Sequence, residues 1–448
     1  MVEEFPSSRS NDLSPIPSSE GKTRISRNRI ILKHMEEGFL AQCEHEAFFN
    51  GEDDNSLLFG MDFADLGGSI FEKEYVYEAI QRFPTWRLRG IKALGFLTMP
   101  VSDPDRQIGF NYRHDRELHI INTARVMEFA MRNNDFPEEL IRIGVTAAIL
   151  HDIAIPAGGD PTIFVDKNNL NEEEWWWEVI DEEGWKYIEE IGSSREEMHA
   201  IINNEGLLGQ LLDISDRIAY VIVDMSQNTY YPDFKTILNA DPKLGNLYKD
   251  IVIDRDAERI HISNPRRLGA FLLARARLHQ KVYFDPRSMG RDVFFASLFR
   301  PFYSPDGSDR EKLFPSMLRR MTDEELIRYL TDNIPNYRNL IKTGIEDPID
   351  FSHALERWYP KEWEKFQTLE EGEVRAEEIR QDPSLELIGI KIVRDVNTAV
   401  GLLVEDGNGN IITFQEYDPK WTALIQETAN SRKGIYVFYN PRAGRAPL

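Results

Sequence analysis

The feature that most constrains this chain is an apolar run that ends in two chemically active residues. Residues 147–150 (Ala-Ala-Ile-Leu) lead directly into His151 and Asp152. The preceding Pro137 predicts the start of a helix and Pro156 predicts its end. An adjacent histidine and aspartate at the end of a buried helix can both reach one metal ion. The pair therefore predicts a helical core with a metal site at one helix end.

Two further residues complete a candidate ligand set. His119 lies upstream and Asp216 lies downstream, each in a region with helical patterning. Imidazole and carboxylate donors suit Fe, Mn, Zn, Co or Ni, and Mg also stays open. Four ligands leave positions for water and a phosphate oxygen, which is the arrangement for metal-assisted phosphate chemistry on one divalent ion. The alternative is that the histidines belong to the core and the aspartates serve as caps or ion-pair partners.

Composition excludes several classes of protein. The chain has 448 residues, a net charge of −23 and a single cysteine, Cys43. Strong negative charge makes a general nucleic-acid-binding surface unlikely, because such a surface needs basic patches. One cysteine excludes an internal disulfide framework and fits a reducing compartment. We find no run of about 18 apolar residues, so we expect a cytoplasmic protein without membrane spans.

The pattern along the chain predicts a mainly α fold with a small C-terminal α+β region. Residues 1–28 are rich in Ser, Pro and Asn and are expected to be a disordered tail. Helical spacing dominates residues 29–370, which we assign to one helical domain. Residues 371–448 are assigned to the α+β region. In it we expect strands at 387–393, 399–404, 411–414 and 434–439 and a helix at 419–429.

Four segments together resemble one known family. They are Trp86-Arg-Leu-Arg-Gly-Ile-Lys-Ala-Leu-Gly95, Arg116-Glu-Leu-His119, His151-Asp152 and Asp216-Arg-Ile-Ala-Tyr220-Val-Ile-Val-Asp224. The chain resembles the HD-domain phosphohydrolases over about residues 85–285. It is most similar to the deoxynucleoside triphosphate triphosphohydrolases, which include the SAM-and-HD-domain enzyme and bacterial dGTPases. The last segment is the most specific, because it repeats an Asp-x-x-x-Tyr-x-x-x-Asp pattern.

The resemblance implies a helical HD bundle and a role for each matched residue. His119, His151, Asp152 and Asp216 would hold the metal, and Arg116 and Arg217 would contact phosphate. Tyr220 would pack against the sugar and Asp224 would accept a hydrogen bond from a sugar hydroxyl. Residues four apart on a helix lie nearly above one another, so the spacing permits this ladder. The implied reaction converts a dNTP to a deoxynucleoside plus triphosphate, in a homo-oligomer.

The chain departs from the family pattern at the segment after His151-Asp152. Two histidines that the family usually carries there fall at Ile155 and Asp160. Asp160 could act as the general acid or orient water. It could equally be a turn residue before Pro161, and residues 172–174 (Glu-Glu-Glu) are alternative proton donors.

A second departure is Ala93, where the family commonly has a glutamine that reads the deoxyribose. Without that amide the site could accept another sugar or another phosphate ester. Two alternatives therefore stay open. The chain could hydrolyse a different phosphate ester or diester, or it could be a catalytically weak nucleotide-binding sensor.

Two other groups of residues stand out. Residues 175–177 are three consecutive tryptophans, which could stack on a base as a lid but more often form core or a subunit interface. Five basic residues on the segment 265–283 lie near the region from which the family draws further phosphate contacts: Arg266, Arg267, Arg275, Arg277 and Lys281. A solvated helix face is the alternative for these five. Arg87 and Arg89 align with a segment at which regulated family members bind an activating nucleotide.

Overall fold

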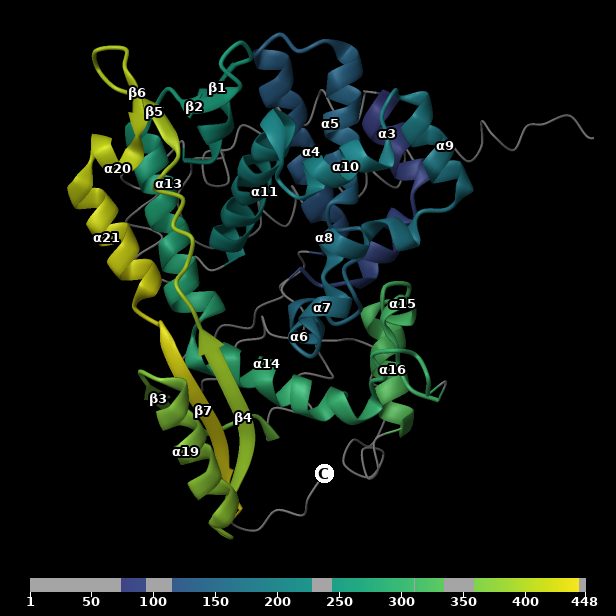
Figure 1. The fold of residues 1–448 in the computed structure, drawn as a ribbon, viewed down its shortest axis with the longest axis vertical. Coiled ribbons are helices and arrows are strands. Elements are labelled where there is room, and N and C mark those ends of the chain that lie inside the picture. Colours follow the sequence, from purple (N-terminus) through teal and green to yellow (C-terminus); the bar gives the residue numbers. More distant parts are fainter. Residues whose placement is uncertain (1–73, 94–114, 228–243, 310, 334–357, 443–448) are drawn as a thin grey trace, which may run out of the picture. The chain divides into compact units, whose positions relative to one another are not determined.

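The computed structural model describes residues 74–93, 115–227, 244–309, 311–333 and 358–442. The predicted tail over residues 1–28 lies outside these ranges. The described residues are mainly helical, with two small sheets to which the C-terminal region contributes most strands (Figure 1). This confirms the predicted fold class. None of the helices in the described ranges is both long enough and apolar enough to cross a membrane.

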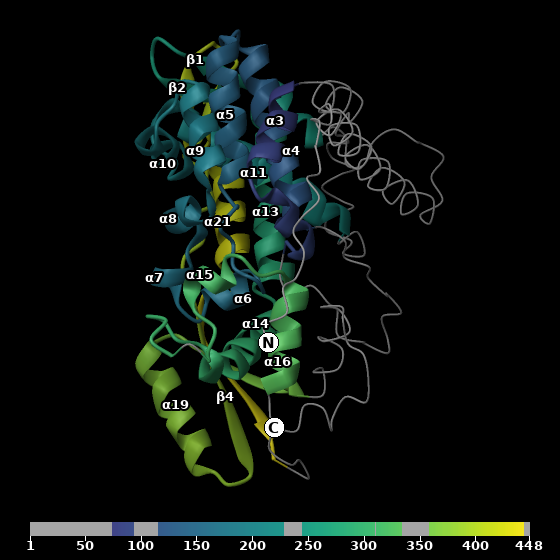
Figure 2. The same cartoon turned by 90° about the vertical axis from the view of Figure 1, so that its right-hand side faces the viewer.

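The candidate site is carried by a core of packed helices. They are α3 (Glu74–Arg82), α4 (Arg116–Asn133), α5 (Glu138–Leu150), α10 (Arg195–Ile202) and α11 (Gly206–Gln227). Helix α4 packs against α5 and α11, and α10 packs against α5 and α11 (Figures 1 and 2). Most of α5 from Ile141 onward is buried. A helix that is apolar on nearly all sides must lie inside a core, so α5 occupies the centre of this group.

A glycine brings α4 and α5 close together. A Cβ atom at Gly144 would lie only 2.6 Å from the sulfur of Met131 and 2.9 Å from the terminal methyl of Met127. The two methionines belong to α4 and are buried. Because a side chain at residue 144 would push the helices apart, Gly144 sets the spacing between the two helices that lead to His119 and His151.

Further helices join the core helices and extend beyond them. Before α10 these are η2 (Thr85–Gly90), α6 (Asp160–Ile163), α7 (Lys167–Leu170), α8 (Glu172–Trp175), η4 (Trp176–Val179) and α9 (Glu182–Glu190). After α11 they are η5 (Leu244–Asp250), α13 (Pro265–Leu278), the π-helical turn η6 (His279–Tyr283), α14 (Pro286–Phe299), η7 (Arg300–Phe302), α15 (Pro315–Leu318) and α16 (Asp323–Asn333).

The first sheet has four strands in the order β1-β2-β5-β6. Its strands are β1 (Ile251–Asp254), β2 (Arg259–Ile262), β5 (Leu403–Glu405) and β6 (Ile411–Thr413). The β1–β2 and β5–β6 pairs are antiparallel, and β2 pairs with β5 in parallel, with His261 opposite Leu403. The sheet therefore joins strands that are about 140 residues apart in the chain.

The second sheet has three antiparallel strands in the order β3-β7-β4. They are β3 (Glu362–Phe366), β7 (Gly434–Pro441) and β4 (Leu385–Val393), and α19 (Leu369–Gln381) packs on them. Ala376 and Ile379 of α19 bury against Val437 of β7. The remaining helices are α20 (Phe414–Tyr417) and α21 (Pro419–Asn430), and α21 packs along α13.

The C-terminal elements follow the prediction except at one strand. The expected strand over 399–404 is confined to β5, because Ala399 has a φ of +55° and accepts a turn hydrogen bond from Leu402 N (3.1 Å). A non-glycine residue in the left-handed region marks a turn rather than a strand. The domain boundary at residue 370 stays a prediction, and strands from both sides of it meet in the four-stranded sheet.

Candidate metal centre

His119 is placed one turn into α4. The helix begins after Asp115, whose carboxylate accepts a hydrogen bond from Leu118 N (2.8 Å) as an N-cap. The His119 side chain is buried, and the helix that carries it, α4, packs against both α5 and α11. A capped helix packed on two others holds the imidazole in one position.

His151 follows the last residue of α5. Its Nδ1 lies 2.8 Å from the carbonyl oxygen of Ala148. Because a carbonyl oxygen can only accept, Nδ1 carries the hydrogen and donates. In the neutral ring the lone pair then lies on Nε2, which faces His119. This is the outer hydrogen bond that usually orients a metal-binding histidine.

Three donor atoms converge at this point. The Nε2 atoms of His119 and His151 are 3.3 Å apart, and Asp216 Oδ1 lies 2.9 Å and 3.7 Å from them. These three residues form a group that could hold a metal ion. Metal–ligand bonds of about 2.1 Å give donor–donor edges of about 3.0–3.4 Å in octahedral or tetrahedral geometry. The spacing of the donor atoms and their N/N/O chemistry both fit a divalent ion.

Asp152 lies beside this group and also contacts an arginine. Its Oδ2 is 3.5 Å from His119 Nε2, and its Oδ1 is 3.8 Å from His151 Nε2. Arg116 Nη1 donates to Asp152 Oδ2 (2.7 Å), and Arg116 Nη2 donates to Asp160 Oδ1 (3.1 Å). All four predicted ligands are thus brought together, and Arg116 links Asp152 to Asp160.

The electrostatics of the centre favour a bound cation. Burial would raise the pKa of Asp216, but hydrogen bonds from His119 and His151 outweigh it and hold that pKa well below its usual range. Burial likewise opposes the charge of Asp152, and Arg116 with both histidines lowers its pKa to about 2. Burial would lower the pKa of His151, yet Asp152 and Asp216 raise it to about 9. Positive charge thus stabilises both carboxylates, and a bound metal ion would take the place of the proton that His151 carries.

Tyr220 and Asp224 of α11, the residues predicted to hold the sugar, contact elements that follow α11 in the chain. Tyr220 OH accepts a hydrogen bond from Arg275 Nε (2.6 Å). Tyr283 OH donates to the buried carboxylate of Asp224. Arg275 belongs to the late basic group considered in the sequence, so one member of that group lies at the ladder. Tyr283 had no signal in the sequence beyond its place in a helical segment.

The two arginines predicted to contact phosphate are both in ion pairs. Arg116 bridges two carboxylates, and Arg217 Nη2 donates to Asp213 Oδ1 (2.7 Å) one turn earlier on α11. The side chains of Arg116 and Arg217 are only 12% and 14% exposed. Because both side chains are little exposed, their positive charges are held in fixed positions. Arg116 lies one helical turn before His119, and Arg217 directly follows Asp216.

The carboxylates considered as proton donors occupy different environments. The Asp160 side chain is 57% exposed at the start of α6. Glu172 begins α8, where burial and the charge of Asp152 raise its pKa to about 8. Burial and Asp152 also raise the pKa of Glu173. Ile155, at the position of the first missing histidine, is fully buried.

Arg87 lies in the core rather than at a ligand-accessible surface. Its guanidinium donates to the carbonyl oxygens of Ile153 (2.8 Å), Ile155 (2.7 Å) and Met321 (2.9 Å). Asp323 accepts from Gly158 N (2.7 Å) and from Lys92 N. Because these guanidinium donors bind backbone carbonyl oxygens, Arg87 contributes to the fold and does not present its charge to solvent. Arg87 and Asp323 instead hold the segment that follows His151-Asp152.

Comparisons with known proteins identify the fold. No family model and no curated protein matches the chain. Among solved structures, it is similar to a hypothetical protein from Aquifex aeolicus, with 18% identity, a TM-score of 0.58, and coverage of 83% of this chain and 93% of the other. It is also similar to a phosphohydrolase from Bacteroides thetaiotaomicron, with 15% identity, a TM-score of 0.53, and coverage of 82% and 96%. The chain therefore shares its fold with a solved protein that is described as a phosphohydrolase.

Proposed function

We propose that this chain is an HD-type metal-dependent phosphohydrolase that acts on nucleotides. The leading reaction is conversion of a dNTP to a deoxynucleoside and triphosphate. The observation that carries the proposal is the convergence of His119 Nε2, His151 Nε2 and Asp216 Oδ1 within one group. The fold shared with a phosphohydrolase from another organism supports the same class of chemistry.

In this proposal one divalent ion (Mn, Fe, Mg, Zn, Co or Ni) is held by His119, His151, Asp152 and Asp216. When bound, such an ion polarises a phosphoryl group and lowers the pKa of a coordinated water. The buried helices α4, α5 and α11 keep the four side chains in place. Asp152 would be oriented by its hydrogen bond from Arg116 (2.7 Å).

Arg116 and Arg217 would neutralise phosphate charge. A guanidinium has five donors in a planar fork, so Arg116 can keep its bond to Asp152 while its second nitrogen turns from Asp160 to a phosphate oxygen. Arg217 would make the same exchange with Asp213. The exposed carboxylate of Asp160 can leave Arg116 and hydrate in water, which keeps the cost of the exchange low.

Tyr220 and Asp224 would hold the sugar. Asp224 accepts from Tyr283, and a carboxylate has further lone pairs for a sugar hydroxyl. Arg275 fixes the Tyr220 ring through its hydroxyl, so the flat face of the ring is presented in one orientation. This polar wall and the metal group share α11, with Asp216 and Tyr220 one turn apart.

Asp160 is the proposed proton donor, with Glu172 as the alternative. Asp160 lies next to the centre, since Arg116 contacts both Asp160 and Asp152, and its carboxylate would become available when Arg116 turns to phosphate. Glu172 has the property that a general acid needs, since its raised pKa of about 8 keeps it protonated at neutral pH. Proton donors of this kind contribute about 10²–10⁴-fold to rate.

One observation favours a second candidate, a nucleotide-binding sensor with weak chemistry. The position of the first missing histidine is filled by Ile155, which is fully buried and has no group that could transfer a proton. If neither Asp160 nor Glu172 replaces it, the centre would bind metal and nucleotide without efficient turnover. Hydrolysis of another phosphate ester or diester is the remaining alternative.

A single set of assays separates these readings. The purified protein is analysed for metal, then incubated with Mn, Mg or Co and with dNTPs, NTPs and a generic phosphodiester. Triphosphate and deoxynucleoside as products support the leading reaction, and tight nucleotide binding without products supports the sensor. Asp160→Asn and Glu172→Gln are compared in the same assay. The variant that loses about 100-fold or more in rate identifies the proton donor.

A further inference from the structure

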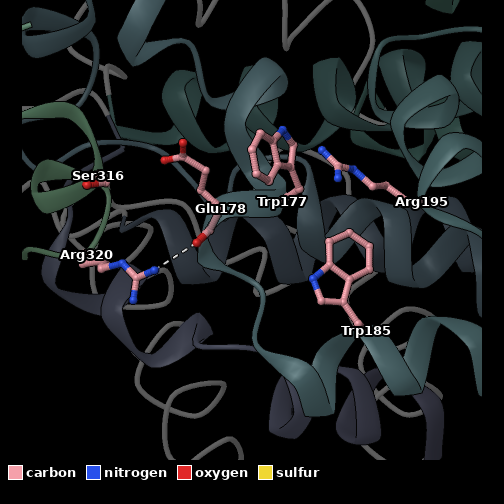
Figure 3. A pocket seen from close by; sticks show the side chains of 6 residues that line it. All are labelled: Trp177, Glu178, Trp185, Arg195, Ser316 and Arg320. Atoms are coloured by element: carbon pink, nitrogen blue, oxygen red, sulfur yellow. Dashed lines mark hydrogen bonds between the residues drawn. The ribbon is translucent and has the colours of Figure 1, made fainter. Parts of the chain in front are cut away.

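A cavity lies away from the metal group, and indole rings and arginine side chains line it. It has a volume of about 600 Å³, in the range of small-molecule sites, and six residues line it: Trp177, Glu178, Trp185, Arg195, Ser316 and Arg320. Figure 3 shows Arg320 on one side of this pocket and Arg195 on the other, with the Trp177 and Trp185 rings near Arg195. Neither tryptophan is fully buried, so both present ring surface.

The positions of the two arginines are defined by contacts. The Arg195 guanidinium lies 4.3 Å from the ring centre of Trp177 and 5.9 Å from that of Trp185. Arg320 Nη2 donates to the carbonyl oxygen of Glu178 (3.0 Å), which leaves its other guanidinium hydrogens for a further acceptor. Arg195 and Arg320 are both exposed to solvent.

The one carboxylate among the six lining residues is neutralised. Glu178 pairs with Arg319, whose guanidinium is buried and also donates to the carbonyl oxygen of Asn169. Arg319 further lies 5.0 Å from the ring centre of Trp175. The pocket therefore presents two cations and a paired carboxylate in a chain whose net charge is −23.

We propose that this pocket binds a small molecule that carries a planar aromatic ring and an anionic group. The ring would stack on the indoles, because offset stacking is favourable between aromatic faces. The anionic group would bind the guanidinium fork of Arg320, which suits phosphate and carboxylate oxygens, and Arg195 would add positive charge beside the indoles. A nucleoside phosphate and an aromatic carboxylate both have this chemistry.

Calorimetric titration of the full chain, with EDTA present, tests the proposal. The probes are AMP and 4-hydroxybenzoate as the two ligand sources, with adenosine and inorganic phosphate as half-ligands. We expect at least one complete probe to bind about tenfold more tightly than either half-ligand, because it combines ring stacking with a charge-assisted hydrogen bond. Absence of binding by both complete probes at millimolar concentration would overturn the proposal.

Variants locate the bound probe. Arg320→Gln should weaken binding about tenfold, and Arg195→Gln should weaken it by a smaller factor. Ser316→Phe should weaken it by narrowing the cavity while keeping the other five lining side chains. Lys186→Gln is the matched control, since Lys186 follows Trp185 in sequence but pairs with Glu190 (3.7 Å) on the exposed face of α9. Unchanged affinity in both arginine variants and in Ser316→Phe would refute the site.

The metal-centre variant Asp216→Ala separates this pocket from the proposed active site. Binding that persists in Asp216→Ala, with loss in the arginine variants, supports the second pocket. Binding that is lost in Asp216→Ala and kept in the arginine variants assigns the probe to the metal centre and overturns the proposal. Circular dichroism of each variant shows that it is folded before titration.

Discussion

Two groups of charged side chains lie at and just after the His151-Asp152 pair, and they differ in what their polar atoms contact. In the metal group, the ring nitrogens of His119 and His151 and a carboxylate oxygen of Asp216 face one another. On the other side, Arg87 and Asp323 contact only backbone groups in the hydrogen bonds described above. Side chains whose donor atoms converge can share one metal ion, whereas those that saturate carbonyl and amide groups support the backbone. Burial of charge alone does not distinguish the two.

The largest expected effect comes from removing a ligand. Asp216→Ala should lower metal content from about one ion per chain to near zero and reduce hydrolysis about 1,000-fold, because a catalytic metal contributes several kcal/mol to the transition state. Metal analysis and product assays measure both. His261→Asn, a buried histidine on β2 outside the group, is the control and should keep metal and rate. Full metal content in Asp216→Ala would show that the centre is misassigned.

Replacing the scaffold arginine should affect folding before chemistry. Arg87→Met leaves three buried carbonyl oxygens without their donor, so we expect the free energy of unfolding to fall by about 3–5 kcal/mol. Denaturant melts measure this loss, with Arg328→Ala as the control. Arg328 forms an exposed pair with Glu324 (2.6 Å), and its loss should cost about 0.5 kcal/mol or less. If Arg87→Met keeps stability but loses metal, the two groups are not distinct.

Adding metal should stabilise the folded chain by an amount set by its affinity. At a free metal concentration about 100 times the dissociation constant, the gain is about 2.7 kcal/mol. Thermal melts with EDTA and with added Mn or Co give this shift. It should disappear in Asp216→Ala and persist in the folded fraction of Arg87→Met. An equal shift in wild type and Asp216→Ala would mean that the stabilising ion binds elsewhere.

The smallest effect is expected at Gly144, where α4 and α5 pack against each other. Gly144→Ala places a Cβ atom against Met131 and should destabilise the chain by about 1–3 kcal/mol through overpacking. Gly401→Ala is the control, since a Cβ atom there has no neighbour within 4 Å among the described residues. Because α4 and α5 carry or precede the histidine ligands, Gly144→Ala should also weaken metal affinity. A stability loss with unchanged metal affinity would show that the helices shift without moving His119 or His151.

Local spacing predicted the metal group well because its members lie on strongly patterned helices. The ladder from Asp216 to Asp224 required only helical geometry, and its residues do lie along α11. Arg275 was singled out only as one of five basic residues and Tyr283 not at all, since both approach from elements more than 50 residues later in the chain. Their contacts depend on tertiary packing, which periodicity does not encode.

Arg87 shows the opposite difficulty. From sequence it is one of two arginines in a short polar segment, and such residues are usually exposed. Burial lowers its pKa only to about 10, so it remains charged in the core at neutral pH. The three consecutive tryptophans also differ in exposure, which their identical residue type could not indicate. Trp176 is buried, whereas Trp175 and Trp177 are partly exposed.

The parallel pairing of β2 with β5 has a practical consequence for anyone shortening this chain. A chain ending at residue 370 would keep β2 but expose the strand edge that β5 covers, and open strand edges promote aggregation. It would also uncover α13, where the Trp421 ring of α21 packs against Gly269. The C-terminal segment thus packs against α13, the helix that supplies Arg275. Solubility and activity should therefore be lost together when the C-terminal segment is removed.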